Sequence, residues 1–183
     1  MHFVFMGVSG SGKTTVAELI AKQLELPLAE ADLFHLPANI RKMEAGTPLT
    51  DEDRWPWLRE LAAWLATHEA LGESTAMACS SLKRSYRDVL REGAPGVRFL
   101  HMHGPPEVIW KRIDAREDHF MPPMLLKSQM ATLEPLGVDE EGREFDVRLD
   151  LETLIEQVLG YAREQLRSQE RDQSARAPQG PAV

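Results

Sequence analysis

The sequence predicts an α/β fold in which helices cover both faces of a five-stranded parallel sheet. Short apolar runs alternate along the chain with segments of helical periodicity, and this alternation favours parallel strands joined by right-handed crossovers. The first run, residues 2–6, is continuous, as in a strand that is buried on both faces. It leads directly into the glycine-rich stretch GVSGSGKT at 7–14 and then into a helix. The expected architecture therefore has three layers.

The first half of the chain predicts two helices and a second strand. Helical spacing follows the glycine-rich stretch, in Val16, Leu19, Ile20 and Leu24. A strand is expected at 26–32, whereas residues 33–52 are expected to be irregular because prolines and a glycine interrupt them. A helix then begins at Thr50 or Asp51, with acidic residues in its first turn. Pro56 lies early in this helix, where a missing N–H group costs little.

The second half of the chain continues the alternation of strands and helices. In chain order, we expect a strand at 75–79, a polar helix at 82–93, a strand at 97–102, a helix at 105–117, a helix that begins after the prolines of 121–133, a strand at 145–151, and an amphipathic helix at 151–162. The segment from residue 168 on has no apolar periodicity. We therefore expect one domain at 1–167 and a disordered tail at 168–183.

Composition and charge exclude several classes of partner. The net charge is −8, and nucleic-acid binding requires a basic surface, so nucleic acid is not expected as the main partner. A small anion stays compatible, because its binding depends on local charge. No apolar run approaches the ~18 residues of a membrane-spanning helix. We therefore expect no contact with a membrane. The single cysteine, Cys79, excludes an internal disulfide, so we expect a cytoplasmic protein.

The stretch GVSGSGKT matches the spacing of a phosphate-binding loop, G-x-x-x-x-G-K-T. Gly7, Gly10 and Gly12 let backbone N–H groups turn toward phosphate oxygens, and the following helix contributes its positive end. Lys13 can then reach the β- and γ-phosphates, and the Thr14 hydroxyl can bind Mg²⁺. The alternative is a glycine-rich turn with an incidental lysine, but the complete match between a strand and a helix favours a site for ATP and Mg²⁺. The nucleotide-binding residues expected here are Gly7, Ser9, Gly10, Ser11, Gly12, Lys13, Thr14 and Thr15.

Missing motifs argue against a GTPase switch and a motor ATPase. A switch GTPase requires a guanine-reading N-K-x-D motif, which the chain lacks. Its D-x-x-G motif is matched by DEEG at 139–142, but this match lies in a late acidic loop, so we interpret it as a coincidence. The third predicted strand ends in ACSS rather than in the acid that motor ATPases carry there. Other residues must therefore distinguish the function.

An acidic pair ends the second predicted strand. Glu30 and Asp32 lie two residues apart, so on a strand they would face the same way, beside the phosphate-binding loop. One carboxylate can orient or deprotonate an acceptor hydroxyl, and the other can hold Mg²⁺ through water. A solvated pair of loop acids is the alternative interpretation of this spacing.

A basic cluster follows the fourth predicted strand. Lys111, Arg112 and Arg116 lie on the expected helix, and the two arginines are four residues apart, which places like charges together. A phosphate between them would offset this repulsion, as when a lid closes over a nucleotide. The alternative is a solvated basic face neutralised by Asp114 and Glu117. Together with the phosphate-binding loop and the acidic pair, an arginine lid predicts a small-molecule kinase.

Three longer blocks of the sequence carry a family resemblance. The first block contains Asp32-Leu33-Phe34-His35, Asn39, Lys42-Met43, Gly46, Pro48-Leu49, Asp51, Asp53-Arg54 and Pro56-Trp57-Leu58. The other blocks are CSSLKRSYRDVLR at 79–91 and REDHFMPPMLLKSQMATLEPL at 116–136. Together they resemble the signature of the gluconokinases of the small P-loop type, and the similarity runs from about residue 3 to residue 160. This resemblance is far more specific than the phosphate-binding loop alone.

The resemblance implies transfer of the γ-phosphoryl group of ATP to the 6-hydroxyl group of D-gluconate. The product would be 6-phospho-D-gluconate, which feeds the pentose phosphate and Entner–Doudoroff routes. The implied fold is that of the nucleoside monophosphate kinases, with a lid at about 112–127, and family members are commonly homodimers. A shikimate- or nucleoside-type kinase is the alternative, although shikimate kinases carry a glycine triplet where this chain has Cys79-Ser80-Ser81. An ATP-binding regulatory protein without catalysis is a further alternative, against which the intact motifs speak.

Carried over by position, the resemblance implies a role for individual residues. Lys13, Asp32 and Arg116 are implied to be catalytic. Arg112 and Arg116 are implied to form the lid over the nucleotide, and Thr14 and Glu30 to hold Mg²⁺, Glu30 through water. The implied gluconate-binding residues are Asp32, His35, Arg54, Lys83 and Gln129.

The chain departs from the family pattern in two places, and one role stays open. The family usually has aspartate at the position of Glu30, and proline often follows the position of His35 directly, whereas Leu36 intervenes here. Arg54 could bind the gluconate carboxylate through two hydrogen bonds, and Lys83 could bind it as a point charge. The sequence does not choose between these two cations.

Other side chains are expected mainly to pack. Cys79 is expected to be a buried filler rather than a nucleophile. His101 and His103 alternate on one strand face, but no acid or cysteine is spaced to add a third metal ligand, so we expect core or strand-end histidines. Trp57 follows helical spacing and is expected mostly to pack, although it could also shape the sugar pocket.

Overall fold

A central parallel sheet organises the chain, and its computed structural model describes residues 1–115 and 123–176. The strands are β1 (His2–Met6), β2 (Leu28–Glu30), β3 (Thr75–Ala78), β4 (Val97–His103) and β5 (Gly142–Asp146). Their order across the sheet is β2-β3-β1-β4-β5, and every neighbouring pair is parallel. The predicted five-stranded parallel sheet is therefore confirmed.

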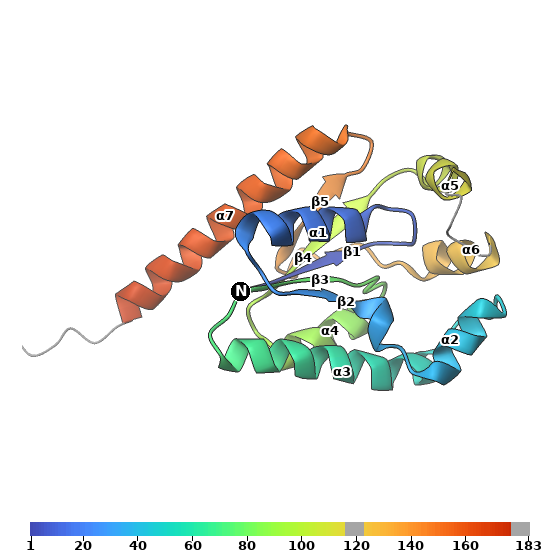
Figure 1. Ribbon diagram of the computed structural model, residues 1–183, viewed down its shortest axis with the longest axis horizontal. Helices are drawn as coiled ribbons and strands as arrows, with labels where there is room; N and C mark the ends of the chain where they lie inside the picture. Colours follow the sequence, from blue (N-terminus) through green and yellow to red (C-terminus); the bar gives the residue numbers. More distant parts are fainter. Residues whose placement is uncertain (116–122, 177–183) are drawn as a thin grey trace, which may run out of the picture.

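Helices cover both faces of the sheet and give the molecule three layers (Figure 1). One apolar core is covered by α1 (Lys13–Leu24) and α7 (Leu151–Arg176). The other is covered by α3 (Asp51–Ala70), α4 (Arg84–Gly93), α5 (Pro106–Asp114) and α6 (Pro123–Thr132). None of these helices, and no other helix in the described parts of the chain, is both long and apolar enough to span a membrane.

The central strand β1 contributes side chains to both cores. Phe3 and Phe5 belong to the core under α1 and α7, whereas Val4 and Met6 belong to the core on the opposite face. Successive side chains of a strand point to opposite faces, so a strand between two helical layers must be apolar throughout. This explains why the first apolar run of the sequence shows no alternation.

The phosphate-binding loop leaves the carboxyl end of β1, at the point where the strand order changes direction. β1 pairs with β3 on one side and with β4 on the other. Parallel α/β sheets form a ligand-binding crevice at such a switch point. The backbone N–H group of Gly7 donates to the Ser80 carbonyl at 3.2 Å, which ties the start of the loop to the segment after β3.

Residues 31–44 contain two short helices, so the expectation of irregular structure over 33–52 is wrong for most of 33–44, whereas residues 45–49 are irregular. A 3-10 helix spans Ala31–Phe34, and α2 spans Pro37–Glu44. Pro37 begins α2 rather than interrupting it, because a proline in the first turn lacks an N–H group that would have no partner within the helix. α3 then begins after Thr50, which forms a capping box with Asp53.

The last strand also differs from the prediction, which placed it at 145–151. It spans Gly142–Asp146 at the edge of the sheet, and Phe145 is its one buried residue. The apolar run from 145 on therefore overlaps only the last two residues of this strand. The following residues lead into α7, whose first turn is capped by Asp150, since an oxygen of this side chain accepts from the Thr153 backbone N–H group at 2.9 Å.

The C-terminal helix α7 is longer than expected, and the prediction of disorder is wrong for residues 168–176. The helix continues through them and extends away from the body of the molecule (Figure 1). Leu166 still packs against the core. Beyond it, glutamine, glutamate, arginine and alanine prolong a helix that is already nucleated, which costs little. Residues 177–183 of the expected tail lie outside the described residues.

Candidate active site

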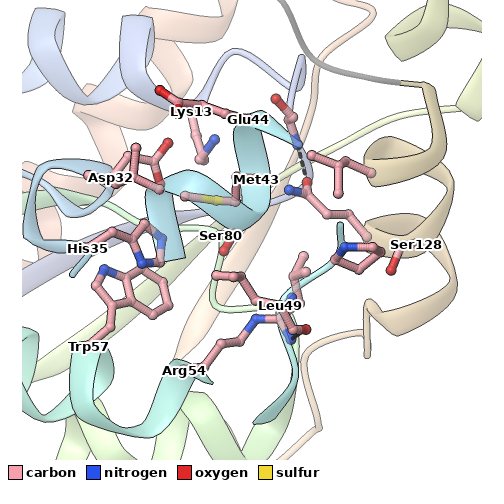
Figure 2. Close-up of a pocket in the computed structure, with 16 residues that line it drawn as sticks. Lys13, Asp32, His35, Met43, Glu44, Leu49, Arg54, Trp57, Ser80 and Ser128 are labelled. Atoms are coloured by element: carbon pink, nitrogen blue, oxygen red, sulfur yellow. Dashed lines mark hydrogen bonds between the residues drawn. The ribbon is translucent and has the colours of Figure 1, made fainter. Parts of the chain in front are cut away.

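A cavity of about 350 Å³ lies beside the phosphate-binding loop, where the carboxyl ends of the central strands meet (Figure 2). The polar part of its wall includes Ser9, Lys13, Asp32, His35, Arg54, Ser80 and Gln129. These side chains come from the loop, the segments after β2 and β3, α3 and α6. They are far apart in the sequence, and the parallel sheet brings them together because its strands all end at one edge.

The phosphate-binding loop has a backbone shape that favours glycine. Gly7 and Gly10 have φ angles of 137° and 80°, a region that side chains disfavour. A Cβ atom at Gly7 would lie 2.7 Å from the Met102 carbonyl oxygen, and one at Gly10 would lie 2.5 Å from Ile113 Cγ1. α1 begins at Lys13, within the last two residues of this stretch, so the first N–H groups of the helix lie at the loop and have no partners inside the helix. The arrangement fits the phosphates of a nucleotide.

The two acids near the end of β2 have different surroundings. Asp32 does not lie on the strand with Glu30, as the sequence predicted, but in the 3-10 helix that follows. The chain turns there, so Asp32 lines the cavity with Lys13 (Figure 2), whereas Glu30 lies against Thr14. Burial raises the pKa of the Glu30 carboxyl, and a hydrogen bond with the Thr14 side chain opposes this shift. The expectation that both acids extend from one strand is therefore wrong.

Glu30 and Thr14 offer oxygen atoms of the kind that Mg²⁺ prefers. One oxygen of the Glu30 carboxyl, Oε1, is buried and has no hydrogen-bond partner among the residues that the structure describes. Such an atom is costly to bury unless an ion or a water molecule satisfies it. The residues present therefore fit a hydrated Mg²⁺ ion next to the phosphate-binding loop.

The far side of the cavity contains a histidine stacked on a tryptophan (Figure 2). The rings of His35 and Trp57 lie 4.3 Å apart, with an interplanar angle of 18°. Trp57 is itself held in place, because its Nε1 donates to the Ala31 carbonyl at 2.8 Å. Burial lowers the pKa of His35, so its ring is neutral at neutral pH. Its buried Nδ1 finds no partner within the described parts of the chain and is available to a ligand hydroxyl.

The two candidate cations for the gluconate carboxylate, Arg54 and Lys83, are placed differently. Arg54 lines the cavity (Figure 2), and its Nη1 donates to the Leu49 carbonyl at 2.6 Å. Lys83 donates to both oxygens of Asp51, at 2.9 and 2.8 Å, and is not among the cavity-lining residues of the described chain. Hydrogen bonding to Asp51 raises the pKa of Lys83. Of the two, only the guanidinium group lines the cavity, and it is 4.0 Å from an oxygen of Asp51, whereas the ammonium group donates two short hydrogen bonds to that carboxylate.

The expected lid residues are placed only in part. Arg112 lies beside the loop, since its Nη1 is 3.8 Å from the position of a Cβ atom on Gly12. Gln129 on α6 contacts the loop directly, because its Oε1 accepts from the Ser9 backbone N–H group at 2.7 Å. Arg116 lies outside the described residues, as do residues 116–122 of the expected lid. The structure thus brings Arg112 and Gln129 to the loop and does not place Arg116.

Sequence reasoning missed one buried ion pair next to the cavity. Arg87 and Glu140 are buried, and their charged groups lie 2.7 Å apart. Glu140 belongs to the DEEG stretch that the sequence left without a role. The available signal was on α4, where Arg87 precedes the buried Leu90 by three residues and so shares its apolar face. An arginine on such a face requires a buried partner.

Cys79 and His101 have structural surroundings. Cys79 is fully buried, and burial raises the pKa of its thiol to about 11, so the thiol is uncharged at neutral pH. His101 lies in the core and is only 4% exposed, and its Nδ1 is 3.1 Å from an oxygen of Glu144. Cys79 belongs to the apolar core, and neither side chain is among the residues that line the cavity.

Comparison with known proteins places this chain in a family. No protein-family model matches the chain. A gluconokinase from Gluconobacter oxydans is 47% identical over 137 residues, which cover 75% of this chain and 77% of that protein. A solved structure of a gluconokinase from Sinorhizobium meliloti is 41% identical, with a TM-score of 0.82 and 97% of each chain covered. The structure of a sugar kinase from a Janibacter species is 58% identical, with a TM-score of 0.85, and covers 88% of this chain and 93% of that one. By sequence and by fold, this chain belongs to the gluconokinase family.

Proposed function

We propose that this protein transfers the γ-phosphoryl group of ATP to the 6-hydroxyl group of D-gluconate and releases 6-phospho-D-gluconate and ADP. The observation that carries the proposal is a shared cavity. Asp32, His35 and Arg54 line the same space as Lys13 of the phosphate-binding loop. A proton acceptor, a ring that can bind a hydroxyl and a cation that can bind a carboxylate are thus within reach of the nucleotide phosphates. Family membership supports the same substrate.

On the donor side, the loop N–H groups and Lys13 bind the phosphates, and Arg112 adds positive charge beside Gly12. We propose that Arg116 adds a second lid cation over the transferred group. Thr14 and Glu30 would hold Mg²⁺, Glu30 through water, and the ion when bound would neutralise charge on the phosphates.

On the acceptor side, Asp32 receives the proton of the 6-hydroxyl group. The oxygen of this hydroxyl forms a bond to the γ-phosphorus, and the bond from that phosphorus to the bridging oxygen breaks, so that ADP leaves. The transition state of phosphoryl transfer is loose, and the protein therefore contributes mainly by positioning the two substrates and stabilising charge.

Gluconate is a monoanion with many hydroxyl groups, so its site requires one cation and several polar side chains. We assign its carboxylate to Arg54, because Lys83 is paired with Asp51 and because a guanidinium group can bind a carboxylate through two parallel hydrogen bonds. His35 and the side-chain Nε2 of Gln129, whose Oε1 accepts from Ser9, are then available to the hydroxyl groups.

We also propose that the enzyme is a cytoplasmic homodimer with one kinase domain at 1–167 and a lid at about 112–127. The family resemblance supports the dimer and the lid, and the buried free cysteine suits a reducing compartment. Light scattering on the purified protein tests the dimer. The expected mass is twice the 20.6 kDa of one chain, and the mass of a single chain would contradict it.

The proposed activity is tested by measuring ADP release with ATP and Mg²⁺ against gluconate, shikimate, nucleosides and neutral sugars. Gluconate is expected to give the highest kcat/KM. The neutral sugars are the informative controls, because they offer hydroxyl groups without a carboxylate for Arg54. Turnover of another acceptor with none of gluconate would contradict the proposal.

A further inference from the structure

Helix α4 buries an arginine that no part of the phosphoryl-transfer mechanism uses. The Arg87 side chain is 0% exposed, although it is one of the largest in the chain. Its Nε and Nη2 atoms donate to the two oxygens of Glu140, both at 2.7 Å. The pair is bidentate, and both charged groups are fully removed from solvent.

The remaining N–H groups of Arg87 bind backbone carbonyls from two separate segments. Nη1 donates to the carbonyls of Ser81 and Glu134 at 3.1 Å each, with a longer contact of 3.5 Å to Leu82. Nη2 donates to the Pro135 carbonyl at 3.2 Å. One segment follows β3, and the other follows α6. We call Arg87, Glu140 and these carbonyls the Arg87 junction.

The Arg87 junction is linked to the phosphate-binding loop through Ser80 on one side and through helix α6 on the other. The Ser80 carbonyl, next to Ser81, accepts from the Gly7 N–H group at 3.2 Å. On the other side, α6 carries Gln129, which accepts from the Ser9 N–H group at 2.7 Å. The segments are joined to each other as well, because the Glu134 N–H group donates to the Leu82 carbonyl at 2.7 Å. The contacts and the intervening backbone form a closed ring, which runs from the loop through Ser80 and Ser81 to Arg87 and returns through Glu134 and Gln129.

Ser81 shows that this ring holds its backbone firmly. Its φ angle is 44°, in the left-handed region that residues other than glycine rarely adopt. Its side chain is fully buried. Such a conformation persists only where the surroundings fix it, and the hydrogen bond from Arg87 to the Ser81 carbonyl is one of the contacts that do so.

We propose that Arg87 is a positioning residue for phosphoryl transfer: it holds the segment after β3, which includes the cavity-lining Ser80 and Leu82, and the end of α6, which carries Gln129, in register with the phosphate-binding loop. Replacing a buried ion pair by well-packed apolar residues is often neutral or stabilising for a protein, so stability alone does not explain this pair. The planar guanidinium group can bind a carboxylate and several carbonyls at once, which apolar side chains cannot do. The proposal rests on the proposed kinase function, because the register of these cavity-lining residues with the loop affects turnover only if an acceptor binds in the cavity.

The test compares Arg87→Lys with Arg91→Lys in the full-length protein. Arg91 lies one turn further along α4 and also contacts Glu140, at 3.3 Å, but it donates to none of these carbonyls. Arg87→Lys keeps the positive charge but loses the planar guanidinium group and its several N–H donors. We expect kcat to fall roughly tenfold to a hundredfold and the KM for gluconate to rise. The dissociation constant for ADP, measured by calorimetry, should stay within about twofold of the wild-type value, because Lys13 and the loop glycines are unchanged. Arg91→Lys should have the wild-type kcat, KM for gluconate and dissociation constant for ADP. A melting temperature that falls in Arg87→Lys while kcat and KM stay at wild-type values would overturn the proposal.

A second variant and a second measurement keep the test decisive if Arg87→Lys does not fold. Glu134 is exposed, and its carboxylate accepts from the Arg84 backbone N–H group at 2.6 Å. Glu134→Ala loosens the same segment without a buried charge, and we expect a KM for gluconate about two- to fivefold higher. Amide hydrogen exchange should be faster at Gly7 and Ser9 in Arg87→Lys, or in Glu134→Ala, than in Arg91→Lys.

The exchange measurement also separates this proposal from the proposed function. A wild-type protein that does not phosphorylate gluconate would contradict the function, and the exchange rates at Gly7 and Ser9 would still decide whether Arg87 holds the ring. Equal exchange rates in the test variants and in Arg91→Lys would overturn the positioning role.

Discussion

The two halves of the cavity are built in different ways. The donor half is one continuous stretch, residues 7–14, whose shape comes from its backbone and which offers N–H groups and Lys13. The acceptor half is assembled from the side chains of Asp32, Arg54 and Gln129, which lie on three separate elements. The two halves are adjacent but consist largely of different residues. A substitution in the acceptor half should therefore change the kinetics with gluconate and leave the affinity for the nucleotide unchanged.

The largest expected effect comes from Asp32→Asn. An amide has the shape of the carboxylate but cannot receive the proton of the acceptor hydroxyl, so kcat should fall by about 10²- to 10⁴-fold. The dissociation constant for ADP, measured by calorimetry, should change by less than about twofold, since Asp32 lies outside the loop. Unchanged turnover would show that Asp32 does not act on the acceptor.

Arg54→Lys is expected to have the next largest effect. Lysine keeps the charge but cannot form two parallel hydrogen bonds to a carboxylate, so the KM for gluconate should rise roughly tenfold to a hundredfold. Lys83→Met is the matched comparison, and it should change this KM by less than about threefold, because Lys83 is occupied by Asp51. Steady-state kinetics that rank the two variants in the opposite order would assign the carboxylate to Lys83.

Trp57→Phe should have a smaller effect, again confined to the acceptor half. Phenylalanine keeps a ring next to His35 but loses the hydrogen bond from Nε1 to the Ala31 carbonyl. The unpaired carbonyl should destabilise the protein by about 1 kcal/mol, which corresponds to a melting temperature about 2–4 °C lower. The KM for gluconate should rise by about two- to fivefold. A loss of ADP affinity as large as the loss of gluconate affinity would mean that the two halves are not separable.

The smallest expected effect is the pH dependence that His35 adds to stability. Burial lowers its pKa in the folded protein below the ordinary value of 6.5. Between these two pKa values the unfolded chain binds a proton that the folded protein does not, so stability falls as the pH decreases through this window. His35→Gln removes the titrating ring. The decrease in melting temperature between about pH 7.5 and about pH 5.5 should be smaller in this variant than in the wild type, and an equal decrease would contradict the assignment.

The same contrast explains what the sequence could predict. The donor half follows from local spacing, because the positive φ angles of Gly7 and Gly10 and the start of α1 at Lys13 are consequences of neighbouring residues. The parallel sheet follows from the alternation of apolar runs with helical segments. Edge positions were less predictable, since β5 contains one buried residue and its apolar run continues past its end.

The geometry of the acceptor half could not be predicted, because it depends on contacts between distant segments. Asp32 was expected on a strand, yet the chain turns into a 3-10 helix one residue before it. Lys83 was expected beside the sugar acid, and its pairing with Asp51 joins the start of α4 to the start of α3. The role of Arg87 depends on four backbone carbonyls. Every residue has such a carbonyl, so the sequence does not show which of them accept from Arg87.

The most direct test of the central claim, that Asp32 and Arg54 present the 6-hydroxyl group of gluconate to the nucleotide, is to identify the product by NMR. The enzyme is incubated with ATP, Mg²⁺ and D-gluconate, and in parallel with 6-deoxy-D-gluconate, which has the same carboxylate and lacks only the reacting hydroxyl group. We predict a single phosphorylated product that carries phosphate on carbon 6, and no phosphorylated product from the deoxy compound. Phosphate on another carbon, or a phosphorylated product from 6-deoxy-D-gluconate, would contradict this account.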